Sequence, residues 1–202
     1  MSKKGVDPQR RLLLQLTTAV GVAGAGVAAV PFVKSMTPSA RARAAGAPVE
    51  VDISSVRPGE IKTVEWRGKP VWILRRTPEM LKALPEVETH LVDPKSQVKD
   101  QQPAYAQNET RSIKPEVLVV VGICTHLGCS PKKELAAGGG AGMGADWQGG
   151  FFCPCHGSKF DLAGRVYKDV PAPRNLPVPP HTYLSDSRIL IGVDPKDKKG
   201  AV

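Results

Sequence analysis

Two hexapeptides decide how this chain folds: Cys124–Cys129 (CTHLGC), here called the first box, and Cys153–Ser158 (CPCHGS), the second box. Together they contain all four cysteines and two of the four histidines of the 202-residue chain. Each box pairs a cysteine with a histidine at metal-ligand spacing and adds one further cysteine. Chance would not confine so scarce a residue to two matching hexapeptides. The boxes therefore offer two thiolates and two imidazoles to a metal centre, with two cysteines left over.

The boxes resemble those of the Rieske iron–sulfur proteins of quinol-oxidising cytochrome bc complexes. The resemblance implies four ligands to one [2Fe–2S] cluster: Cys124, His126, Cys153 and His156. It places the two cysteines on one iron and the two histidines on the other, and it implies a disulfide between Cys129 and Cys155. Because neutral imidazole replaces anionic thiolate, such clusters have potentials of about −150 to +300 mV, against about −400 mV in plant-type ferredoxins.

Two other interpretations of the boxes use the same residues. A tetrahedral zinc site can take two cysteines and two histidines, but zinc pairs usually have the spacing C-x2-4-C or H-x3-5-H, whereas one residue separates Cys124 from His126. Two plain disulfides would leave both box histidines without a role. The remaining histidines, His90 and His181, lie outside the boxes and are interpreted as ordinary surface or satisfied histidines.

The N-terminal part combines a basic segment, residues 1–11, with an uncharged run, residues 12–33. The 22 residues of the run span about 33 Å as a helix, enough for a hydrocarbon core of about 30 Å. The positive-inside rule places the basic end in the cytoplasm and the rest of the chain on the periplasmic side of the bacterial inner membrane. The pair Arg10-Arg11 resembles a twin-arginine export signal.

Export as a folded domain fits this cofactor, because the cluster site does not exist in an unfolded chain. The disulfide implied by the resemblance also needs an oxidising compartment, which the periplasm supplies. Small-x-small cleavage patterns occur at residues 40–42 and 42–44. The resembling proteins of proteobacteria keep the segment, and we expect a retained single-pass anchor.

The rest of the chain is predicted to be a flexible hinge, residues 34–48, and a head, residues 49–202. The hinge contains no large apolar residue beyond Met36 and cannot bury a core. Many short strands with frequent Pro and Gly predict a mainly β head, an antiparallel β-sandwich. The resemblance implies three layers, with a small cluster-binding subdomain over about residues 117–170. The boxes are expected on loops between strands.

Local patterns predict individual elements of the head. Strands are predicted at residues 49–53, 60–66, 70–75, 116–123, 151–152, 165–167, 176–178, 183–184 and 188–193. A helix is predicted from Thr77-Pro78 to Leu84, with Thr77 as its N-cap. Residues 93–114 are predicted to be loop. The Gly-rich residues 138–150 are predicted to be a flexible surface insertion rather than a phosphate-binding loop, because no Lys-Ser/Thr follows.

Further family positions surround the cluster. They correspond here to Leu127, Gly128, Gly157, Ser158, Phe160, Pro171, Ala172 and Pro173. The resemblance implies that the glycines let amide groups point at the sulfides, that Ser158 donates to a sulfide, and that Leu127 covers the cluster. It also implies that Pro171–Pro173 form a third wall. High-potential members have Tyr where this chain has Phe160, so we expect a lower potential than in those relatives.

The resemblance implies an electron-transfer subunit of ubiquinol–cytochrome c reductase, inactive alone and part of a dimeric complex. It would take one electron and a proton from ubiquinol at the quinol-oxidation site of cytochrome b, through His156 or His126, and pass the electron to a membrane-bound c-type cytochrome. The net charge of +9 does not indicate nucleic acid, because the basic residues are scattered and aromatic residues are few. A lipid bilayer is the simpler partner.

Two rival classes share the cluster. Soluble Rieske ferredoxins and oxygenase components usually lack the extra cysteine pair and the anchor. Membrane-anchored Rieske proteins of the arsenite oxidase type share the export signal, but the stretches VEVDIS and VEWRGKPVWILRRT of the head resemble the proteobacterial quinol-oxidising members. A neighbouring gene for cytochrome b would distinguish the two cases.

Overall fold

The chain divides into two units, Met1–Ala44 and Ala45–Val202. The structure is a computed structural model that describes residues 7–138, 143–144 and 146–195. The first unit contains helix α1 (Pro8–Ser35), capped by Asp7, whose carboxylate accepts from Gln9 N at 3.0 Å. By length and composition α1 can cross a membrane. It includes the predicted span, while the basic residues before Asp7 lie outside the described residues.

The predicted hinge, residues 34–48, is not wholly irregular. It contains the last residues of α1 and a six-residue helix α2 (Ala40–Ala45). A helix this short is marginal without tertiary contacts, so the segment can exchange between helix and extended chain at small cost. Its function as a hinge stays a prediction.

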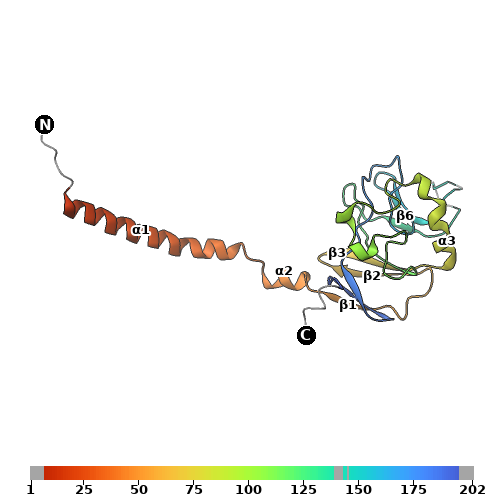
Figure 1. The fold of residues 1–202 in the computed structure, drawn as a ribbon, viewed down its shortest axis with the longest axis horizontal. Helices are drawn as coiled ribbons and strands as arrows, with labels where there is room; N and C mark the ends of the chain where they lie inside the picture. The colour runs from red at the N-terminus through yellow and green to blue at the C-terminus, as the bar shows by residue number, and fades with distance from the viewer. Residues whose placement is uncertain (1–6, 139–142, 145, 196–202) are drawn as a thin grey trace. The chain divides into compact units, whose positions relative to one another are not determined.

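The described part of the head contains three antiparallel sheets of three strands each, confirming the mainly β prediction. One sheet has the order β1 (Val49–Asp52), β9 (Arg188–Ile191), β8 (His181–Ser185). The middle sheet has the order β2 (Ile61–Trp66), β3 (Lys69–Arg75), β4 (Val117–Val121). The third has the order β5 (Lys132–Glu134), β6 (Gly150–Cys153), β7 (Ser158–Phe160). Figure 1 labels strands β1, β2, β3 and β6 of the head.

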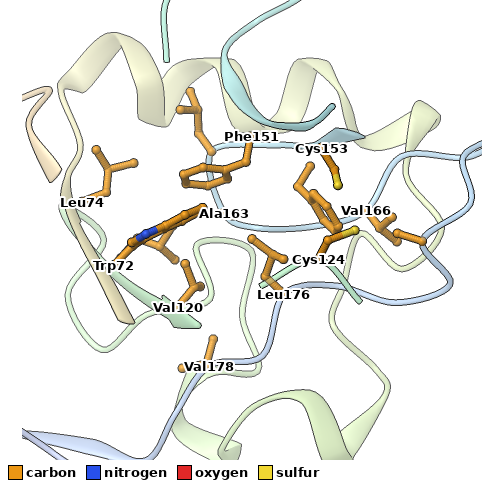
Figure 2. Close-up of a cluster of buried hydrophobic side chains, with 14 of the residues drawn as sticks. Trp72, Leu74, Val120, Cys124, Phe151, Cys153, Ala163, Val166, Leu176 and Val178 are labelled. Atoms are coloured by element: carbon orange, nitrogen blue, oxygen red, sulfur yellow. The ribbon is translucent and has the colours of Figure 1, made fainter. Parts of the chain in front are cut away.

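The middle sheet separates two hydrophobic cores because side chains alternate along its strands. One face joins the first sheet in what we call the base core: Val71, Ile73, Val117 and Val119 with Val51, Ile189 and Ile191. The other face joins the third sheet in the cluster-side core (Figure 2): Trp72, Leu74, Leu118 and Val120 with Phe151, Cys153 and Phe160. Every residue of β4 is buried, as the unbroken apolar run predicted.

Two local predictions are confirmed in detail. The β2–β3 hairpin turns at Arg67 and Gly68, whose φ values of 53° and 69° match the mirror-image turn that fits strand twist. Helix α3 (Pro78–Glu86) begins after Thr77, whose hydroxyl accepts from Met80 N at 3.3 Å. The helix ends two residues later than predicted.

Two predicted strands are wrong. No strand forms at residues 176–178, where Leu176 N donates to Gly164 O at 2.8 Å and Val121 N donates to Pro177 O at 2.8 Å. The prolines nearby lack N–H groups, so no ladder can continue. Residues 165–167 make only isolated bridges. The three-residue strands β5 and β7 were not predicted, because so short a segment shows no alternation.

The predicted loop at residues 93–114 is irregular but not a solvated loop. It contains the 3-10 helices η2 (Lys99–Gln101) and η3 (Ala104–Ala106), and the preceding η1 covers Glu88–His90. It buries polar side chains, among them Gln102 at 6% exposure and Arg111 at 0%. Its polar side chains form a buried hydrogen-bond network, which the prediction of a loop did not include.

The predicted flexible insertion, residues 138–150, is anchored where the structure describes it. Trp147 is 3% exposed, donates from Nε1 to Glu134 O at 2.9 Å, and stacks on Tyr167 with ring centroids 5.8 Å apart. Met143 is buried as well. Residues 139–142 and 145 lie outside the described residues. Trp147 was the residue in the sequence that could have indicated an anchored segment, but the prediction relied on the glycine content instead.

Candidate metal centre

The two boxes have the same backbone turn. Gly128 N donates to Cys124 O at 3.1 Å, and Gly157 N donates to Cys153 O at 2.9 Å. Both glycines have positive φ, 86° and 78°, a conformation that other residues rarely adopt. A Cβ built at either glycine would meet no described atom within 4 Å, apart from the glycine itself and its two chain neighbours. Glycine is therefore needed for conformation, and both glycine N–H groups are used inside the turns, so the predicted hydrogen bonds to sulfides would have to come from other amides.

Different elements carry the two boxes. The second box is the turn of the β6–β7 hairpin, where Cys153 and Ser158 are paired in register. The first box follows β4 through Gly122, whose missing side chain matters: a Cβ there would overlap the indole of Trp72. Gly122 N also donates to Pro70 O at 2.8 Å. This close approach was not predicted from the sequence, because it depends on a residue fifty positions away.

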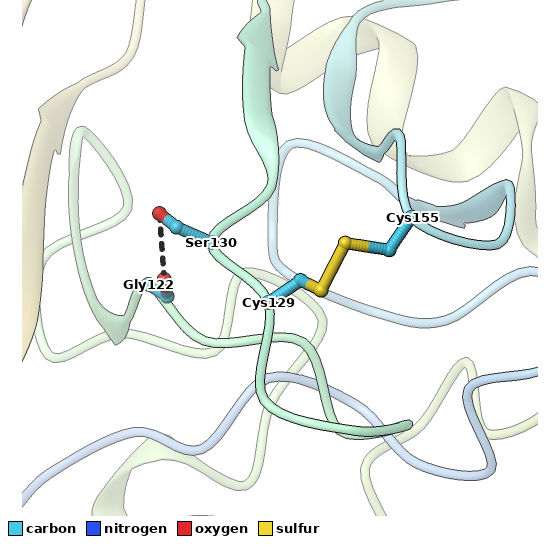
Figure 3. The surroundings of a disulfide bond; sticks show 4 residues. All are labelled: Gly122, Cys129, Ser130 and Cys155. Carbon is cyan, nitrogen blue, oxygen red and sulfur yellow. Dashed lines mark hydrogen bonds between the residues drawn. A yellow bond between two sulfur atoms is a disulfide. The ribbon is translucent and has the colours of Figure 1, made fainter.

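The disulfide between Cys129 and Cys155 is present, as the resemblance implied (Figure 3). It links the two boxes across a sequence separation of 26 residues. Next to it, Ser130 Oγ donates to Gly122 O at 3.3 Å, which closes the far side of the first box. The boxes therefore meet as one site built from two sheets.

The four implied ligands come together with their two chemistries separated. Cys124 and Cys153 are free thiols, 3% and 2% exposed. His126 is half-buried and His156 exposed, and their rings meet edge to face with centroids 4.8 Å apart. Buried sulfur donors and accessible nitrogen donors fit a cluster with one iron on each pair. The disulfide sulfurs, which lie within 4.8 Å of Cys153 Sγ, are already bonded and do not ligate.

Burial raises the pKa of the Cys153 thiol above its ordinary value, and the neighbouring Cys124 thiol raises it further. The free protein therefore holds this group as a neutral thiol at neutral pH. Because iron binds the thiolate, loading the site must release its proton.

The predicted third wall, which we call the proline loop (Pro171–Pro173), contacts the second box, and the residue after it, Arg174, contacts the first. Ala172 is 2% exposed, and its N–H donates to Ser158 Oγ at 3.0 Å. Thr125 Oγ1, in the first box, donates to Arg174 O at 2.6 Å. The Ser158 oxygen thus accepts from the loop, which leaves its hydrogen free to donate elsewhere. Sequence reasoning missed the Thr125 contact, since a backbone acceptor leaves no sequence signal.

Other predicted residues differ in their surroundings. Leu127 is 72% exposed, unusually high for leucine, at the tip of the first box. Phe160 is fully buried in the cluster-side core and is paired with Phe151. Arg10 and Arg11 lie in the first turn of α1, in the other unit of the chain. They take no part in the metal centre.

Comparisons with known proteins show which family the chain is similar to. Residues 48–180 match the family described as "Rieske [2Fe-2S] domain", and residues 1–39 match "Ubiquitinol-cytochrome C reductase Fe-S subunit TAT signal". The ubiquinol-cytochrome c reductase iron-sulfur subunit of Allochromatium vinosum is 61% identical, over 96% of this chain and 93% of that protein. Its namesake from Blastochloris viridis is 43% identical, over 91% and 92%. A chain from a "Hyperthermophilic respiratory Complex III" superposes with a TM-score of 0.47 at 26% identity, over 86% of this chain and 96% of that one.

Proposed function

Because the chain belongs to the Rieske iron–sulfur subunits of ubiquinol–cytochrome c reductase, we propose that it moves one electron from ubiquinol to a membrane-bound c-type cytochrome. The cofactor is one [2Fe–2S] cluster of Rieske type. The observation that carries the proposal is the separation of ligand chemistries: the thiols are buried, while a histidine ring faces outward. Among the described ligand residues, the imidazole side is therefore the side open to a substrate.

The ligand set in this proposal is the one the site brings together: Cys124, Cys153, His126 and His156. When bound, the cluster supplies a one-electron acceptor whose potential is raised by imidazole ligation. The protein's contribution is to hold this group rigidly between two sheets and to leave one edge accessible.

His156 is the first choice for contact with quinol, since it is the exposed ring, and His126 is the second. The ring nitrogen left free of iron would accept a hydrogen bond from the quinol hydroxyl and then its proton, while the bound cluster would accept the electron. Leu127 stands beside this edge with most of its side chain in solvent. Burying it in the quinol pocket of cytochrome b would stabilise docking by about 1.5–3 kcal/mol.

The membrane arrangement forms the second part of the proposal. Helix α1 anchors the subunit in the bacterial inner membrane, with the N-terminus cytoplasmic and the head periplasmic, inside a dimeric complex. Residues 34–48 let the head travel between cytochrome b and the c-type cytochrome. Stiffening this segment with prolines should slow turnover and leave the cluster signal intact. Unchanged turnover would reject the movement.

The proposal is tested by low-temperature EPR of membranes that contain the full chain. Ascorbate should produce a reduced [2Fe–2S] signal with a low average g value, and an inhibitor of the quinol-oxidation site should alter its line shape. A signal insensitive to the inhibitor would reject the cytochrome b partner and favour an arsenite oxidase type of subunit. A signal that only dithionite reveals would mean a potential too low for quinol oxidation.

A further inference from the structure

The proline loop is the tip of a closed loop whose two ends are joined. We call the joined part the neck: residues 163–166 on one side and residues 175–176 on the other. Leu176 N donates to Gly164 O at 2.8 Å, and Asn175 Oδ1 accepts from Val166 N at 2.8 Å. Asn175 is fully buried. The loop between the two sides therefore has a fixed base.

Arg111 spans both sides of the neck. Its Nη1 donates to Ala163 O and Gly164 O at 3.2 Å each and to Leu176 O at 2.8 Å. Its Nη2 donates to Gln102 Oε1 at 3.1 Å. The side chain is 0% exposed, and the hydrogen bonds given above all end on carbonyl oxygens. Burial lowers the pKa of Arg111 to about 10, so the guanidinium stays charged at neutral pH.

The tip of the closed loop makes three contacts with the residues around the cluster site. Ala172 donates to Ser158 in the second box, Arg174 accepts from Thr125 in the first box, and Ala172 packs in the core that contains both ligand cysteines. A shift of the neck would move all three contacts together. The orientation of the Ser158 hydroxyl depends on the first of them.

We propose that Arg111 is a positioning residue that fixes the proline loop over the two boxes, and through it the Ser158 hydroxyl and the entry of water to the cluster. This rests on the proposed function, in that the boxes must hold the cluster. A buried, charged guanidinium is costly to desolvate, and here its hydrogen bonds go to carbonyls rather than to a carboxylate. That use of an arginine suits a clamp on backbone geometry.

Arg76 provides a matched control. It is 2% exposed, and burial lowers its pKa to about 10 as well. Its donors reach Leu162 O, Thr110 O, Pro115 O and Ser112 Oγ. It donates to the turn before the neck, and none of these hydrogen bonds reaches residues 175–176. Removing either arginine deletes one buried positive charge, but only Arg111 joins the two sides of the neck.

The experiment compares Arg111→Gln with Arg76→Gln in the full chain, in membranes, by redox titration followed by EPR. We expect Arg111→Gln to lower the midpoint potential, seen as a smaller reduced fraction at the potential that half-reduces the wild type, and to broaden the EPR line. Arg76→Gln should shift the potential less and keep the wild-type line width. Arg111→Lys, which retains donors for the carbonyls, should lie closer to the wild type.

Equal potential shifts in the two glutamine variants would overturn the proposal, because buried charge would then explain both. An unchanged potential and line in Arg111→Gln would overturn it too. If Arg111→Gln assembles no cluster, Arg111→Lys and Arg76→Lys decide by the same criterion. Inhibitor sensitivity of the wild-type signal is recorded in parallel. A wild-type signal that the inhibitor does not alter would refute the proposed function, but the comparison of the arginine variants would remain valid.

Discussion

The two boxes have the same turn and are supported in different ways. The second box closes a hairpin, so the strands on either side already hold its ends together. The first box leaves β4 in the middle sheet and leads to β5 in the third, and no strand pair closes it. The first box is held instead by the hydrogen bond from Cys124 N to Cys129 O at 2.8 Å, by the disulfide and by the close approach of Gly122 to Trp72. A shared motif therefore does not mean shared stability.

Substitution of the ligand cysteine should have the same effect in either box. Cys124→Ser and Cys153→Ser should each abolish the cluster, because each box supplies one of two buried thiolates. Iron analysis and visible absorption of the full chain measure the loss. Ser130→Ala, next to the first box, is the control and should keep its iron. Retention of a normal cluster in either cysteine variant would reject the ligand assignment.

Removal of the disulfide should destabilise the first box more than the second. Because its cysteines are separated by 26 positions in the sequence, the double variant Cys129→Ala/Cys155→Ala should lose about 3.5 kcal/mol of unfolding free energy on a loop-closure estimate. Alanine is chosen so that no new thiol stands beside Cys153. Chemical denaturation of the variant and the wild type measures the difference.

Hydrogen exchange then shows where the loss falls. The Gly128 N–H in the first box should exchange much faster in the disulfide-free variant, while the Gly157 N–H in the hairpin should change less. Equal acceleration at both glycines would break the comparison. It would mean that the disulfide stabilises the site as a whole.

Glycine substitutions near the two boxes should destabilise the protein for different reasons. Gly122→Ala should cost about 1–3 kcal/mol, because its methyl group meets the Trp72 ring. Gly157→Ala should cost about 1–2 kcal/mol through its positive φ of 78°, where space is free. Adding Trp72→Leu should relieve the first and not the second in double-mutant cycles of unfolding free energy. Additive behaviour at Gly122 would disprove the steric account.

Phe160→Tyr adds a hydrogen-bond donor beside the second box only. We expect a raised midpoint potential, since a hydroxyl that donates to a ligand sulfur stabilises the more negative, reduced cluster. Phe160 is fully buried, so a hydroxyl that found no partner would instead cost about 1–3 kcal/mol of stability. Redox titration and denaturation together separate these outcomes. A loss of stability without a rise in potential would refute the hydrogen-bond explanation for this position.

The comparison also shows what a sequence can and cannot predict. The boxes and their disulfide were implied by the family resemblance. The strands β3 and β4, the unbroken apolar run of β4 and the Thr77 cap follow from local chemistry, and each was predicted. The first box's dependence on Trp72, and the clamp by Arg111, join residues far apart in the chain. Arg111 lies in a polar, Pro-containing segment that was predicted to be loop, and its burial was not predicted because the acceptors of its hydrogen bonds were not known. Those acceptors are backbone carbonyls, which every sequence has.

The smallest predicted effect concerns a histidine outside both boxes. His181 is fully buried, and since a carbonyl only accepts, its Nδ1 must be the donor to Pro179 O at 2.9 Å. Nε2 is left without a hydrogen-bond partner among the described residues. Burial lowers the pKa of His181 below its ordinary 6.5, so the unfolded chain binds the proton first as pH falls. Stability should therefore decline below pH 6.5, by less than about 1.4 kcal/mol per pH unit.

His181→Gln tests this without touching the exposed edge of the site. Urea unfolding at pH 7.5 and pH 5.5 gives the loss of stability on acidification for the wild type and the variant, and their difference isolates His181. The wild type should lose more. Box histidines and carboxylates contribute equally to both curves, so they cancel. Identical losses in the wild type and the variant would mean that the folded protein accepts a proton at His181 without cost. The acid sensitivity would then originate in other groups, such as the box histidines.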